Sequence, residues 1–247
     1  MLRICILLVS LLALSVPGLA AAAPKGNLGN PGVLPPNASA HGKTYGEWSA
    51  EFWKWQFSLP VDDNPIFDTA DCSEGQSGHV WFLGGTTSST EIAPGVILGE
   101  ATRDCTVPAG TALFFPIVNV ECSTVEGNGT TEAELRACAN SFADLIVDLA
   151  AELDGWSLHN LSSYRVESPL FTFGPLPDNN VLEFFGVNAP EGTTSPSVSD
   201  GVHLLLAPLS VGDHTLHFTG TLDLSSIGGP TIIQDITYHL SVVPHGP

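Results

Sequence analysis

The side chains best suited to acid–base chemistry are dispersed along the sequence and form no recognised catalytic motif. Glu121 follows the apolar run 111–120 (TALFFPIVNV), with Asn119 two residues before it. Polar residues at the end of a buried strand often line the mouth of a pocket, so Glu121 is a candidate catalytic residue. With Glu47 or Glu51 it would form a carboxylate pair.

Three histidines complete the candidate catalytic set: His203, His217 and His239. His217 and His239 fall on the outward faces of two predicted consecutive strands, so they could meet across a ladder. Paired with Asp213 or Asp235, they could bind a metal ion or transfer a proton. The alternative is two exposed histidines on a polar sheet face.

An acidic segment follows Pro60 (VDDNPIFDTADCSEGQSG) and contains four candidate calcium ligands: Asp62, Asp63, Asp68 and Asp71. Carboxylate and carbonyl oxygens are the ligands that calcium prefers, but the alternating spacing of an EF-hand is absent. We expect a hydrated acidic loop and predict no cofactor, with calcium as the alternative.

An amphipathic helix is predicted over 44–58, with an unusually large aromatic face. Thr44 and Glu47 form a capping box, and Pro60 prevents continuation. Such a face must be buried, and Gln56 projects within it. Candidate ligand contacts are Trp48 and Gln56 on this helix and Trp81 beyond it. The alternative is that all three are core residues.

Residues 1–23 have the charged start, apolar run and small-residue end of a secretory signal peptide. We therefore expect a secreted or periplasmic protein with no transmembrane anchor, a Pro/Gly-rich lead-in over 24–43 and a single β-rich domain over 44–247. The net charge of −19 excludes nucleic acid and anionic membranes as partners, because like charges repel.

Four cysteines remain after export, and an even number in an oxidising compartment indicates two disulfides. No cysteine–histidine spacing typical of zinc is present. We favour pairings that close local loops, and these are Cys72–Cys105 and Cys122–Cys138.

The chain contains 25 glycines and 19 prolines, which favours many turns and short strands. A second helix is predicted over 131–153, and strands over most of the remainder, including 181–185. Alternation is clearest over 214–222 and 232–243. The predicted fold class is mainly β (α+β by content): an antiparallel β-sandwich or jelly-roll-like domain with two covering helices, about 44–58 and 131–153.

Several short motifs resemble a pattern in exported prokaryotic proteins with a β-sandwich-like C-terminal part. They are Tyr45-Gly-Glu-Trp, Trp53-Lys-Trp, Gly78-His-Val-Trp-Phe-Leu, Val107-Pro-Ala-Gly-Thr and Gly212-Asp-His-Thr-Leu. The segments 209–218 and 238–244 are similar to the closing hairpin of immunoglobulin-like sandwiches. These resemblances imply a fold and no particular activity.

The function that these observations favour is non-catalytic: an exported module that binds a small ligand, a glycan or another surface. One alternative is a secreted hydrolase or lyase whose dispersed site draws on Glu121, the histidines and the acidic loop. Another is a calcium-stabilised structural protein of the cell exterior.

Overall fold

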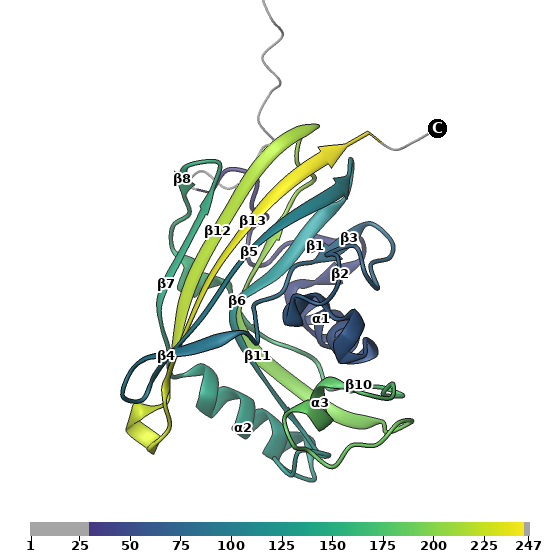
Figure 1. Ribbon diagram of the computed structural model, residues 1–247, viewed down its shortest axis with the longest axis vertical. Helices are drawn as coiled ribbons and strands as arrows, with labels where there is room; N and C mark the ends of the chain where they lie inside the picture. Colours follow the sequence, from purple (N-terminus) through teal and green to yellow (C-terminus); the bar gives the residue numbers. More distant parts are fainter. Residues whose placement is uncertain (1–29, 245–247) are drawn as a thin grey trace, which may run out of the picture.

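The computed structural model describes residues 30–244 as two packed β-sheets with three helices (Figure 1). The predicted signal peptide, 1–23, and the first part of the lead-in lie outside the described residues. The mainly β, sandwich-like fold class is confirmed. None of the helices within residues 30–244 has the length and apolar character to span a bilayer.

The larger sheet has six strands in the order β4-β5-β13-β12-β7-β8. Their bounds are β4 Ser89–Ala93, β5 Val96–Pro108, β7 Ile146–Leu153, β8 Trp156–Ser157, β12 Gly212–Asp223 and β13 Thr231–Val243. All neighbours are antiparallel except β5 and β13, which run parallel along their full length. The alternation predicted for β12 and β13 is confirmed, because Leu216, Phe218 and the even-numbered residues 236–242 are buried.

The smaller sheet has five strands, in the order β10-β11-β6-β3 with β9 also paired to β11. Their bounds are β3 Val80–Phe82, β6 Ala112–Ser123, β9 Arg165–Glu167, β10 Phe171–Phe173 and β11 Ser195–Leu206. The β3–β6 pair is parallel. A separate two-stranded ribbon, β1 Ser39–Ala40 with β2 Lys43–Thr44, precedes the first helix, and short 3₁₀ turns cover 61–63, 65–67, 161–164 and 225–227.

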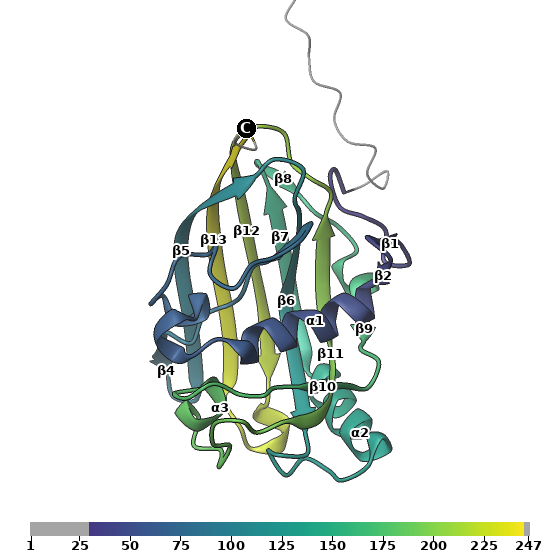
Figure 2. The ribbon, with the colours of Figure 1, turned by 90° about the vertical axis from the view of Figure 1, so that its right-hand side faces the viewer.

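The first helix, α1 (Tyr45–Ser58), lies across β6 and β11 on the outer face of the smaller sheet (Figure 2). Its capping box is formed as predicted, with Glu47 bonded to the Thr44 backbone N–H and hydroxyl. The core therefore has three layers: the larger sheet, the smaller sheet and α1. Between the sheets, Phe115 stacks on Phe218 with ring centroids 4.9 Å apart. On the other face, the ring centroid of Phe114 lies 6.2 Å from that of Tyr45 on α1.

A β-bulge in β6 changes which residues face α1. Val202 pairs with Val118 and His203 with Pro116, so Ile117 has no opposite residue on β11. Pro116, which has no N–H to donate to a ladder, lies beside this bulge. Because the bulge adds one residue, the face that carries Phe114 and Pro116 continues with Asn119 and Glu121.

The predicted helix over 131–153 is only half correct. The second helix, α2, covers Glu132–Ala143, and residues 146–153 form β7 at the side of β12. Leu149, Ala151 and Leu153 lie on one face of this strand, with the spacing of two that a strand requires. In the sequence, Leu145, Leu149 and Leu153 are also spaced by four residues, which is the spacing expected of a helix. β-branched Ile146 and Val147 favour the strand.

The strand predicted over 181–185 is wrong. This segment forms the short helix α3 (Val181–Phe184), which Asn180 caps by accepting hydrogen bonds from the backbone N–H groups of Leu182 and Glu183. The Asn180 amide also donates to Glu183. Asn three residues before Glu is a helix-start signal that the apolar composition of 181–185 obscures.

Both favoured disulfides, Cys72–Cys105 and Cys122–Cys138, are present. The first ties the acidic segment to β5, and the second ties α2 to β6.

Replacement of Phe115 by alanine tests the contact between the sheets. We expect Phe115→Ala to lower the free energy of unfolding by about 3–5 kcal/mol, because it leaves a cavity against Phe218. Urea denaturation with an unchanged m-value would measure this loss. Ile227→Ala, at a side chain that is 61% exposed, is the control and should leave the midpoint nearly unchanged. A small effect of Phe115→Ala would contradict the packing of the two sheets through Phe115 and Phe218.

Candidate functional site

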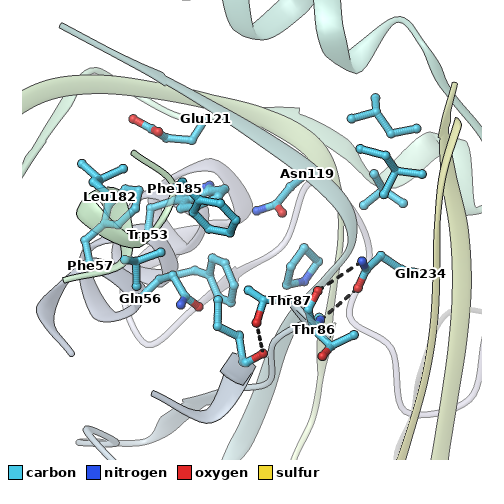
Figure 3. Close-up of a pocket in the computed structure, with 18 of the residues that line it drawn as sticks. Trp53, Gln56, Phe57, Thr86, Thr87, Asn119, Glu121, Leu182, Phe185 and Gln234 are labelled. Carbon is cyan, nitrogen blue, oxygen red and sulfur yellow. Dashed lines mark hydrogen bonds between the residues drawn. The ribbon is translucent and has the colours of Figure 1, made fainter. Parts of the chain in front are cut away.

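A pocket of about 360 Å³ lies beside α1, where α3 and residues of both sheets approach it (Figure 3). Helix α1 supplies one wall and β6 the facing wall, with α3 at one end. Residues 85–87 and two strands of the larger sheet complete it. The residues that line it include Trp53, Gln56, Asn119, Glu121, Glu126 and Phe185.

Three residues of this pocket carry buried polar atoms with no hydrogen-bond partner: Trp53 Nε1, Gln56 Oε1 and Asn119 Nδ2. Within residues 30–244 only four buried side-chain N or O atoms are unpaired, and the fourth belongs to Arg103. Figure 3 shows Asn119 projecting between α1 on one side and Gln234 on the other. Such atoms are rare in folded proteins, so their concentration at one pocket is the strongest sign of a ligand site.

The orientation of the Gln56 amide is fixed by a neighbour. Gln56 Nε2 donates to Asn64 Oδ1 at 3.0 Å, and the Asn64 amide donates back to the Gln56 carbonyl at 3.0 Å. Asn64 Oδ1 also accepts from the Ile66 backbone. Because Asn64 must present its oxygen to two donors, the free atom of Gln56 is its acceptor, Oε1. Gln56 is only 2% exposed.

The rim formed by residues 84–87 is held by long-range hydrogen bonds. Tyr238 donates to the Gly84 carbonyl at 2.8 Å, and Arg103 donates to the Gly84 and Gly85 carbonyls and to the Tyr238 hydroxyl. The Gln234 side chain exchanges hydrogen bonds with the Thr86 backbone (Figure 3). This wall of the pocket is therefore preformed.

Two carboxyl groups, Glu121 and Glu126, meet at the pocket. Glu121 also accepts from the Ser197 hydroxyl, and Glu126 accepts from the Ser123 hydroxyl at 2.6 Å. Burial and the adjacent Glu126 raise the pKa of Glu121 well above its ordinary value of 4.5, against the opposing effect of the two serine hydroxyls. A raised pKa means that the pair holds a proton at pH values where isolated carboxylates are charged.

The structure brings only part of the predicted site together. Gln56 and Glu121 both line the pocket, whereas Trp48 and Trp81 do not. Trp48 Nε1 donates to the Ala40 carbonyl, and its ring lies under Lys43. Glu51 forms ion pairs with Lys43 and Lys54 instead of joining Glu121, so the carboxylate partner expected from α1 is wrong.

His203 is fully buried under α1 and does not line the pocket. Its Nδ1 lies 3.0 Å from the Gly201 carbonyl, which can only accept, so Nδ1 carries the proton and Nε2 accepts from Ser49. Burial lowers the pKa of His203 to about 3. The residue is a neutral, hydrogen-bonded part of the core.

His217 and His239 lie on the outer face of the larger sheet, away from the pocket residues. His217 of β12 lies opposite Thr237, and His239 of β13 lies opposite Thr215, so the two histidines are diagonal neighbours. His217 Nε2 is 2.8 Å from Asp235 Oδ1, and His239 is exposed.

The aspartates of the acidic segment bind separate partners. Asp68 accepts from Arg103 at 2.7 Å, Asp62 from Asn179, and Asp71 from the Ser73 backbone, while Asp63 is exposed. In the described part of the chain no three His, Cys, Asp or Glu side chains are grouped so as to hold a metal ion. Calcium binding stays a prediction that this arrangement does not favour.

Sequence reasoning missed Glu126, Phe185 and Gln234 as pocket residues. Glu126 follows Glu121 by five residues, across the turn after β6, and this proximity was an available signal. Phe185 was assigned to a strand, and Gln234 is a polar residue within a regular strand pattern, so neither had a distinguishing signal.

Comparison of the chain with protein-family models, curated proteins and solved structures finds no match. The resemblance to exported prokaryotic proteins therefore stays a prediction, and the function has to be inferred from the pocket.

Replacement of Glu121 by glutamine tests the acidic pair through the pH dependence of stability. A carboxyl group with a raised pKa in the folded state stabilises most below its unfolded pKa of about 4.5, and this contribution is lost as pH rises through the folded pKa. We expect Glu121→Gln to raise the melting temperature relative to wild type at about pH 8, with the gain shrinking toward about pH 4.5.

Thermal melts across this range would measure the difference. Glu100→Gln, at an exposed carboxylate on β5, is the control and should show no such trend. A Glu121→Gln variant that is less stable than wild type at the alkaline end would contradict the raised pKa.

Proposed function

We propose that the chain is an exported, non-catalytic binding protein that holds a small organic molecule in the pocket between α1, α3 and β6. The observation that carries the proposal is the clustering of Trp53 Nε1, Gln56 Oε1 and Asn119 Nδ2, all unpaired, at one pocket. A buried polar group without a partner costs about 1–3 kcal/mol. A ligand that supplies the partners recovers part of this free energy on binding.

The composition of the walls supports a small molecule over a macromolecular surface. Most lining side chains are apolar or aromatic, with a few polar groups between them, which is typical of ligand pockets. The alternatives, a glycan or another protein surface, would use a flat exposed face in place of a pocket.

Binding is favoured over the hydrolase or lyase alternative by the positions of the candidate catalytic residues. Glu121 lines the pocket, but none of His203, His217 and His239 does. Within the described residues Glu121 is therefore not joined by any of these histidines at the pocket, and the His217–Asp235 pair lies away from it.

Export is supported by the two disulfides, which form and persist in oxidising compartments. Together with the predicted signal peptide, they support secretion or a periplasmic location as part of this proposal.

Asn119→Leu separates a ligand-binding role from a structural one. The substitution removes an unpaired amide at nearly constant volume, so we expect it to raise the melting temperature of the ligand-free protein. It should also reduce the stabilisation given by small amphiphiles such as N-benzylacetamide, measured as the shift in melting temperature. If Asn119 only supports the fold, the ligand-free variant melts lower than wild type.

Asn30→Leu is the matched control. Asn30 is as buried as a core residue, at 3% exposed, and its amide is paired in both directions with the backbone of His159. We expect this substitution to lower the melting temperature and to leave the response to amphiphiles unchanged. The opposite signs of the two Asn→Leu variants are the outcome that supports the proposal.

A further inference from the structure

The charge of the pocket is entirely negative. Among the residues that line it, Glu121 and Glu126 are the only titratable groups, and none is Lys, Arg or His. The two carboxyl groups lie against each other, and their neighbours Ser197 and Ser123 supply hydroxyl donors but no charge.

The cationic side chains on neighbouring elements are bound to other acids. Arg136 of α2 pairs with Glu132 and Glu167, and Arg165 of β9 pairs with Asp144 and Asp200 of β11. On α3, the carboxylate of Glu183 accepts from Asn180. The described chain therefore supplies no positive charge to the acidic pair.

Aromatic side chains surround the same space. Trp53 and Phe57 are in contact, with ring centroids 5.3 Å apart, and Phe185 of the α3 segment lies beside them (Figure 3). Aromatic faces attract cations through their quadrupole, and aromatic walls combined with carboxylates are the usual means of recognising organic ammonium groups.

We propose that the ligand is an organic cation, a protonated or quaternary amine on an apolar body, with its charge beside Glu121 and Glu126. The proposal rests on the function proposed above and names the class of ligand. The apolar body contacts Trp53, Phe57 and Phe185. A hydroxyl, carbonyl or amide group on the ligand pairs with Asn119 or Gln56, whose unpaired atoms are a donor and an acceptor.

A matched pair of probes, 4-phenylbutylamine and 4-phenylbutan-1-ol, tests the preference for positive charge. The two molecules have the same apolar body and differ at the end group, which is a charged ammonium in the amine and a neutral hydroxyl in the alcohol. We expect the amine to bind the disulfide-intact protein about tenfold more tightly than the alcohol near pH 7.5, by isothermal titration calorimetry.

The acidic pair is tested by the double variant Glu121→Gln/Glu126→Gln, because either single replacement leaves one carboxylate that can carry the negative charge. The double variant should reduce the amine affinity about tenfold, toward that of the alcohol, and should leave the alcohol affinity unchanged. Glu100→Gln, which removes a charge elsewhere on the surface, is the matched control and should bind both probes as wild type does.

The pH dependence gives a readout that a structural role would not produce. The amine keeps its proton up to about pH 10, so between about pH 5 and pH 8 only the protein groups titrate. The proton held by Glu121 competes with the cation, so the amine should bind more tightly as pH rises, and the alcohol should not.

The outcomes distinguish the two proposals. Equal affinities for amine and alcohol, unchanged by the double Glu121→Gln/Glu126→Gln replacement, would overturn the cation preference and leave the pocket as a site for neutral ligands. No binding of either probe, together with a destabilised Asn119→Leu variant, would overturn both.

Discussion

The extra residue in β6 is the constraint on which the pocket depends. With Ile117 unpaired opposite Val202 and His203, the side chains that follow it exchange faces. Asn119 and Glu121 thereby join Phe114 and Pro116 on the face that meets α1, and Val118 packs toward β12, where Gly220 leaves room for it. A regular strand would direct Asn119 and Glu121 to the opposite face, where Leu135 and Ala139 of α2 form an apolar cluster. Gly201 allows the close approach of β11 beside Asn119.

The features that the sequence predicts well are those set by local chemistry. The capping box of Thr44 and Glu47, the stop at Pro60 and the alternation of β12 and β13 could be inferred because each depends on neighbouring residues. Both disulfides could be inferred because each joins cysteines that are consecutive in the exported chain. Residues 144–153 and 181–185 could not. The spacing of their apolar residues fits both a helix and a strand. Residues 146–153 form a strand because they pair with the distant strand β12, and residues 181–184 form a helix because Asn180 caps it.

The candidate site was only partly predictable for a related reason. Gln56 is a polar residue on an aromatic helix face, and Glu121 is an acid at the end of an apolar strand. Because both are unusual in their local sequence, both could be predicted as site residues. Their assembly into one pocket depends on the bulge, on the crossing of α1 over β6 and on the position of α3. None of these has a signal in composition or periodicity. Trp53 shows the same ambiguity, because a tryptophan on a buried helix face is ordinarily a core residue, and only its unpaired Nε1 indicates more.

The position of β13 within the larger sheet has a consequence for when the protein can fold. This strand lies between β5 and β12, and its parallel partner β5 precedes it by more than a hundred residues in the sequence. The larger sheet therefore stays divided until the last strand arrives, and long-range parallel pairing is slow to form. In a chain of this topology the larger sheet cannot be completed until residues 231–243 have been made, whereas every strand of the smaller sheet lies before residue 207.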